Sequence, residues 1–131
     1  MNNKSDKTIA AAQKLIDTRF FTESVHCSYY AVFQLMMYKL ANAINSPMSY
    51  EEQKEKAKAA RQSSHENILL EYKKRLGISP KDEKKLTNEF RWLKEKRQKA
   101  DYSDNVFSSE DGLECKKIAE GLIYKLKHYT I

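Results

Sequence analysis

The sequence predicts an all-α protein, an antiparallel up-and-down bundle of four to five helices in a single domain spanning residues 1–131. The chain is 131 residues long, which is enough to bury a core. Three glycines and two prolines in the whole chain leave few residues for the tight turns of a β-rich fold. Residues 20–44 are apolar on most sides, and a helix of that kind must be surrounded by other helices.

The central helix is expected over residues 20–44, which read FFTESVHCSYYAVFQLMMYKLANAI. No glycine or proline interrupts it, and its leucines and methionines favour a helix. Its longest run without strongly polar side chains is far shorter than the roughly 20 residues of a membrane span, so we expect no membrane association. One polar stripe follows the helix at helical spacing and consists of Glu23, His26, Tyr30 and Gln34. We expect this stripe to contact a neighbouring helix, a partner subunit or a ligand.

The segments on either side of the central helix differ in character. A first helix is expected from a cap at Ser5 to about Asp17, followed by a short break near Arg19. Residues 50–62 follow a capping-box pattern that begins at Ser49, but they offer only two alanines as apolar anchors. We interpret these residues as a solvated insertion, either a helix held loosely at the surface or a disordered segment.

Three further helices are expected in the second half of the chain. The first opens at Ser64-His65 and ends at Gly77, a residue typical of the position after a helix. The second opens at Ser79-Pro80, a capping serine followed by a proline in the first turn. Its buried stripe is Leu86, Phe90 and Leu93, and the next position of that stripe is Arg97. The last helix begins near Ser108, with an expected buried stripe of Leu113, Ile118, Ala119, Leu122 and Leu126.

Composition limits the kinds of site and compartment. The net charge of +6, from 24 basic and 18 acidic residues, permits binding to nucleic acid or another polyanion. Cys27 and Cys115 lie in expected helices without CxxC spacing, so we expect reduced core residues of a cytoplasmic protein. The first residues contain no apolar leader segment, which fits the same compartment. Three scattered histidines and the absence of a Gly-rich phosphate loop predict no metal site and no cofactor.

One local group of residues could carry chemistry, at the end of the helix that contains Arg97. Arg97 and Asp101 are four residues apart, close enough to pair on a helix, and Tyr102 adds a phenolic hydroxyl. In a functional interpretation, Arg97 binds a phosphate and Asp101 fixes its orientation. In a structural interpretation, the pair joins this helix end to the central helix. The sequence leaves both open.

The same helix is strongly basic around Arg97. Its other cations form a candidate basic patch interleaved with Phe90 and Trp92, and they are Arg91, Lys94, Lys96 and Lys99. Basic and aromatic side chains together favour single-stranded nucleic acid, through backbone contact and base stacking. An ordinary solvated helix face has the same composition, and the sequence alone does not distinguish the two.

These motifs together resemble a known family. The run SVHCSYYAVFQLMMYKLA is similar to the SxYYAxFxxxxxLL pattern of HEPN domains (higher eukaryotes and prokaryotes nucleotide-binding). Ser64-His65 and the later run LKEKRQKADYSD resemble the rest of that pattern, as found in small stand-alone prokaryotic HEPN proteins. The resemblance spans roughly residues 9–126. It implies a helical bundle that forms a homodimer, is encoded beside a minimal nucleotidyltransferase, and acts in a toxin–antitoxin or defence setting.

The resemblance also implies site residues. HEPN ribonucleases carry an Arg-x(4–6)-His motif that cuts RNA without metal, with two copies meeting at a dimer cleft. Arg97 matches the arginine, but Asp101 and Tyr102 stand where the histidine is expected. We therefore expect binding of RNA, a nucleotide or a nucleotidyltransferase partner without cleavage. Two alternatives remain: a divergent ribonuclease that uses Arg97 with His26 or Tyr102, and a structural oligomerisation adaptor.

Overall fold

The computed structural model describes residues 3–131, and within them it contains six helices and no strand, which confirms the all-α class. The helices are α1 (Asn3–Asp17), α2 (Phe21–Ala41), α3 (Tyr50–Ala59), α4 (Ser64–Lys74), α5 (Pro80–Tyr102) and α6 (Ser109–His128). The helices number one more than the four to five expected, because residues 50–59 are helical.

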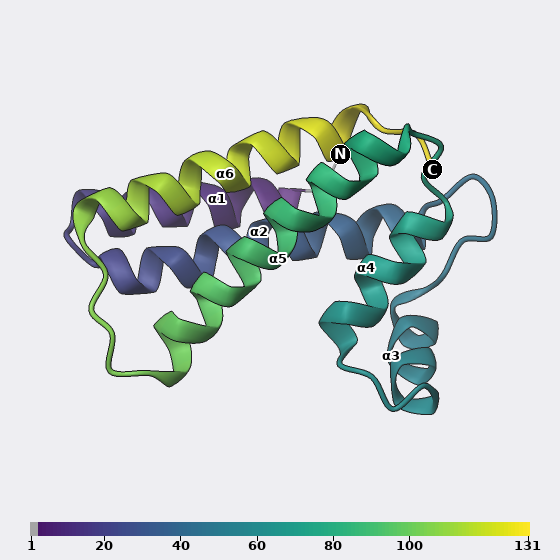
Figure 1. Cartoon of the computed structure of the whole chain (residues 1–131), viewed down its shortest axis with the longest axis horizontal. Coiled ribbons are helices and arrows are strands. Elements are labelled where there is room, and N and C mark those ends of the chain that lie inside the picture. Colours follow the sequence, from purple (N-terminus) through teal and green to yellow (C-terminus); the bar gives the residue numbers. More distant parts are fainter. Residues whose placement is uncertain (1–2) are drawn as a thin grey trace.

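Helix α2 is the centre of the assembly, as its apolar composition predicts. It contacts all five other helices, and ten of its 21 residues are buried. Figure 1 shows α1 and α6 running beside α2, while α5 crosses in front of it and diverges from α4 and α3. The described core is built largely on this helix and on the inward faces of α4, α5 and α6.

Capping serines set the starts of four helices. The hydroxyl groups of Ser49, Ser63, Ser79 and Ser108 each accept a hydrogen bond from the backbone N–H three residues later. The turn between α1 and α2 places Arg19 at a φ of 68°, which ends α1 and lets α2 fold back against it. Gly112 lies where α6 meets α2, and a Cβ there would come within 2.9 Å of the Ser24 hydroxyl oxygen. Glycine therefore permits this close approach of the two helices.

Three details of the expected helices are wrong. Gly77 does not end its helix, because α4 ends at Lys74 with Arg75 as the C-cap, and Gly77 has no positive φ. Ser5 lies inside α1 instead of capping it, and its buried hydroxyl donates to the backbone carbonyl of Ala31 at 2.6 Å. Leu113 is exposed, and the buried stripe of α6 instead begins with Gly112 and Cys115. The stripe differs because Gly112, and not Leu113, lies where the first turn of α6 approaches α2.

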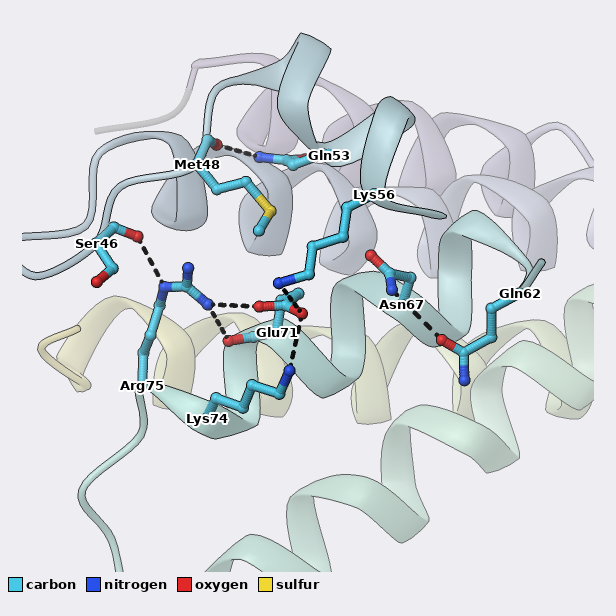
Figure 2. Close-up of polar contacts among 9 residues, drawn as sticks. All are labelled: Ser46, Met48, Gln53, Lys56, Gln62, Asn67, Glu71, Lys74 and Arg75. Carbon is cyan, nitrogen blue, oxygen red and sulfur yellow. Dashed lines mark hydrogen bonds and ion pairs between the residues drawn. The ribbon is translucent and has the colours of Figure 1, made fainter. Parts of the chain in front are cut away.

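The segment interpreted as a solvated insertion is the helix α3, and polar contacts attach it to the bundle. Gln53 is buried, and its Nε2 donates to the backbone carbonyls of Met37 at 3.0 Å and Met48 at 2.8 Å. The Lys56 ammonium lies 3.0 Å from the carboxylate of Glu71 on α4. Figure 2 shows the Gln53–Met48 bond and the Glu71 carboxylate surrounded by cations. Apolar periodicity could not predict this attachment, because hydrogen bonds and ion pairs provide it.

Candidate functional site

Arg97 is the charged member of the buried stripe of α5, and it faces inward. Its residue is 5% exposed, and its Cζ lies 5.0 Å from the ring centroid of Tyr29 and 5.5 Å from that of Tyr30. A guanidinium over aromatic faces at this distance gains a cation–π attraction. The nearest carboxylate oxygen, Asp101 Oδ2, is 3.6 Å from Nη1, and the buried Nε has no hydrogen-bond partner. The Arg97 charge is thus buried and only partly compensated.

His26 and Asp101 form a pair at the surface above Arg97. The Nδ1 atom of His26 lies 2.9 Å and 3.0 Å from the two carboxylate oxygens of Asp101. The side chains are 46% and 20% exposed. Because a carboxylate only accepts, the Nδ1–H group of His26 donates to Asp101. The sequence separates these residues by 75 positions, and the fold brings them together.

A second histidine lies deeper in the same region. Nδ1 of His65 is 2.6 Å from the hydroxyl oxygen of Tyr29, and its ring stacks on Phe33 with centroids 4.3 Å apart. Burial, and after it the charges of Arg97 and Lys94, lower the pKa of His65 to about 4. Burial also raises the pKa of Tyr29. Both groups are therefore neutral at pH 7, and the tyrosine O–H donates to the imidazole.

The rings of the region lie in a continuous row, which we call the aromatic strip and define as His26, Tyr30, Phe33 and His65, with Phe33 buried. Tyr30 lies between the two histidines, with centroids 4.5 Å from His26 and 5.8 Å from His65. At the His26 end, Glu23 and Asp101 line a surface cavity of about 380 Å³. The predicted stripe residues Glu23, His26 and Tyr30 thus do gather at one edge of α2.

His65 lies among the aromatic side chains of α2, which its position in the sequence does not indicate, and Tyr102 lies at the surface. Tyr102 is 79% exposed, and its side chain makes no hydrogen bond with the residues that the structure describes. The fold brings His65 beside Tyr29 and Tyr30, whereas the sequence shows it only as a residue near a helix start. The available signal was its place in the Ser64-His65 opening of the family pattern.

The four residues of the basic patch are divided over α5 and each has a local partner. Arg91 and Lys94 both pair with Glu66 of α4, Lys94 at 3.7 Å. Lys96 lies over the Trp92 ring at 5.4 Å, and Lys99 lies 3.3 Å from the Glu95 carboxylate. Only Arg91 and Lys94 therefore approach the aromatic strip, through the Glu66 that follows His65.

Neither a metal-binding cluster nor a membrane-spanning helix is found among the described residues. Between residues 3 and 131, no group of three His, Cys, Asp or Glu side chains is arranged to hold a metal ion. None of the helices described is long and apolar enough to cross a membrane. Comparison of the chain with protein-family models, curated proteins and solved structures finds no match. The HEPN resemblance therefore remains a prediction.

Proposed function

We propose that this protein binds single-stranded RNA or a nucleotide along the aromatic strip of α2. One observation carries the proposal: the strip runs from the His26–Asp101 pair to His65, and Glu66, the residue after His65, pairs with Arg91 and Lys94. Aromatic rings stack on bases, and cations beside them contact the phosphate backbone. His26, whose side chain is 46% exposed, is a further contact, since imidazole nitrogens can hydrogen-bond to RNA.

Fluorescence anisotropy with labelled single-stranded RNA at two salt concentrations tests this proposal. We expect binding that weakens with salt, and Lys94→Gln should reduce the salt slope by about 1. Tyr30→Leu should remove a stacking surface worth about 1–3 kcal/mol. His128→Asn, a change at an exposed histidine of α6, is the matched control and should bind like the parent. A response that is absent, or that does not depend on salt, would contradict the proposal.

A second candidate, RNA cleavage without metal, is favoured by the His26–Asp101 pair itself. Asp101 orients the imidazole so that Nε2 can take the proton of the 2′-hydroxyl group. The 2′-oxygen would then bond to the adjacent phosphorus and displace the 5′-oxygen, which takes a proton from the imidazolium, leaving a 2′,3′-cyclic phosphate and a 5′-hydroxyl group. The histidine absent from the end of α5 would then be supplied by α2. Arg97, whose guanidinium is 3.6 Å from Asp101, would be a positioning residue for that carboxylate and not a substrate contact.

Incubation of purified protein with labelled RNA in a chelator separates cleavage from binding alone. If His26 is the base, His26→Asn should slow cleavage by roughly 10²–10⁴-fold, and Asp101→Asn should slow it while leaving RNA affinity almost unchanged. His128→Asn serves again as control. Absence of any cleavage that depends on His26 would leave binding as the function.

The assembly implied by the family resemblance belongs to the same proposal: a cytoplasmic homodimer that works with a minimal nucleotidyltransferase in a toxin–antitoxin or defence setting. Light scattering after gel filtration measures the subunit number. Inspection of the neighbouring gene tests the partner, because an adjacent nucleotidyltransferase is expected. A monomer at micromolar concentration, with no such neighbour, would favour RNA binding by a single chain. The adaptor alternative predicts a stable oligomer that binds neither RNA nor nucleotide.

A further inference from the structure

A second cavity opens between α1, α2, α3 and α4, and it shares the buried Phe33 with the aromatic strip. Its volume is about 440 Å³, within the range of small-molecule sites in proteins. Its apolar lining includes the buried Phe33 and Ile68 together with Met37, and Tyr50 of α3 lies at its edge with a largely exposed ring. Met37 is eleven residues along α2 from His26, roughly 16 Å away, so the cavity is distinct from the His26–Asp101 edge.

The α3 wall of this cavity is held in place by contacts that do not fill it. Gln53 donates to the backbone of Met37 and Met48, and Lys56 reaches Glu71 on α4, as Figure 2 shows for the Met48 and Glu71 contacts. Within α3 only Gln53 and Ala57 are buried. Apolar walls that no side chain covers lose dispersion contacts, which a bound molecule can restore. Polar attachment therefore keeps α3 at a distance that leaves room for a ligand.

Charge at the cavity selects the kind of ligand. Two of its nine lining residues are lysines, Lys4 of α1 and Lys54 of α3, and none is acidic. Lys54 is exposed on α3 and makes no ion pair with a described residue. An apolar interior with cations among its lining residues fits an amphipathic anion better than a neutral or cationic molecule.

We propose that this cavity binds a small aromatic carboxylate. The ring system packs against Phe33, Met37 and Ile68, and the carboxylate meets the Lys54 ammonium. The bound molecule would add contacts between α3 and the helices α2 and α4. Without it, the polar contacts of α3 with these helices are those of Gln53 and Lys56. For a ligand of naphthoate size, we expect a dissociation constant on the order of 1 mM or tighter.

NMR titration of the full chain, labelled at methionine and isoleucine methyl groups, tests the proposal with 2-naphthoate as the probe. We expect saturable shifts of the Met37 and Ile68 methyl signals and nuclear Overhauser contacts from these methyl groups to naphthalene protons. The neutral analogue 2-naphthamide should bind more weakly. Shifts that do not saturate, contacts that map to another surface, or equal binding of the amide would each overturn the proposal.

Charge variants on α3 separate recognition from folding. Lys54→Glu should weaken 2-naphthoate binding roughly three- to tenfold, because an attractive contact becomes repulsive. Lys58→Glu makes the same change one turn further along the exposed face of α3 and should leave the affinity unaltered. Because both side chains are exposed, both variants should fold, which the unshifted methyl spectrum verifies. Equal weakening by both variants would show a general charge effect and overturn the assignment of Lys54.

Discussion

Two buried charged side chains in this molecule differ in how fully neighbouring groups compensate their charge. Glu71 on α4 is 2% exposed, and its carboxylate pairs with three cations, Lys56 at 3.0 Å, Lys74 at 3.1 Å and Arg75 at 3.0 Å. Arg97 on α5 is also almost fully buried, but its one carboxylate neighbour is 3.6 Å away and its Nε has no partner. The carboxylate is over-compensated, and the guanidinium is under-compensated.

This difference in charge compensation distinguishes Glu71, which links helices, from Arg97, which lies at the candidate site. Glu71 joins α3 to α4, and Arg75 extends the joint by donating through Nε to the backbone carbonyl of Ser46 at 3.0 Å (Figure 2). A buried charge that lacks full compensation raises the free energy of the folded state, so its retention needs another reason. Arg97 lies directly below the exposed His26–Asp101 pair, where incomplete pairing is compatible with a role in binding or catalysis.

The largest effect on stability is expected at Glu71. Glu71→Gln keeps the shape of the side chain but removes the charge that three cations share, so the free energy of unfolding should fall by about 2 kcal/mol. Urea denaturation measures the change, and hydrogen exchange should show α3 opening first. Glu55→Gln, on the exposed face of α3, is the control and should change stability by less than about 0.5 kcal/mol. Equal stability of the two variants would break the comparison.

A smaller effect on stability is expected at Arg97, although it is equally buried. Arg97→Met replaces the guanidinium with an apolar chain that can pack against Tyr29 and Tyr30. Asp101 keeps His26 as its partner and is partly exposed, so no buried charge is left alone. We expect a change within about 1 kcal/mol, because replacement of a poorly compensated buried ion is often neutral. RNA binding or cleavage should nevertheless decline, and a loss of stability larger than that of Glu71→Gln would contradict this interpretation.

Acid titration distinguishes the two regions by the pH at which each loses stability. The pKa of Glu71 is about 2 in the folded chain: burial acts to raise it, but hydrogen bonds from Lys56, Arg75 and Lys74 outweigh that effect. Its contribution is present above pH 4.5 and is lost as the pH falls toward 2. His65 has its folded pKa lowered from 6.5 to about 4, so the unfolded chain binds a proton first and stability falls between these values.

Urea unfolding at a series of pH values tests this prediction by difference between variants. His65→Gln should remove the loss between pH 6.5 and 4, and Glu71→Gln should remove the loss below pH 4.5. Arg97→Met should reduce only the loss of stability between pH 6.5 and 4. The reason is that the Arg97 charge is, after burial, a secondary cause of the lowered His65 pKa. If Arg97→Met also changed the loss of stability below pH 4.5, the two regions would be coupled.

Much of the fold follows from apolar periodicity, and the exceptions have physical causes. The central position of α2 and the buried line Leu86, Phe90, Leu93 are predictable, since a helix must cover its apolar faces. The attachment of α3 is not predictable, because Gln53 and Lys56 look like solvated residues until the backbone and carboxylate that they bind are in place. Helical periodicity describes one element at a time and does not predict such contacts between elements.

The candidate site likewise has features that the sequence predicts and features that it does not. An arginine on an apolar stripe signals an unusual environment, and Arg97 is indeed buried. The His26–Asp101 contact joins residues 75 positions apart, and helical spacing cannot indicate which face of α2 meets the end of α5. Composition predicts the basic patch. It does not reveal that Glu66 and Glu95 pair with three members of the patch.

The smallest effect is expected at Tyr102, which the sequence placed beside Arg97 as an alternative catalytic partner. Five residues along a helix turn a side chain by about 140°, away from the face that Arg97 occupies. Tyr102→Ala should therefore change the free energy of unfolding by less than about 0.5 kcal/mol and leave RNA affinity and any cleavage unaltered. Parallel assays with His26→Asn supply the contrast, since that change should reduce activity. If Tyr102→Ala lost activity and His26→Asn did not, the working edge would lie at the exposed end of α5, and the under-compensated Arg97 would be no guide to the site.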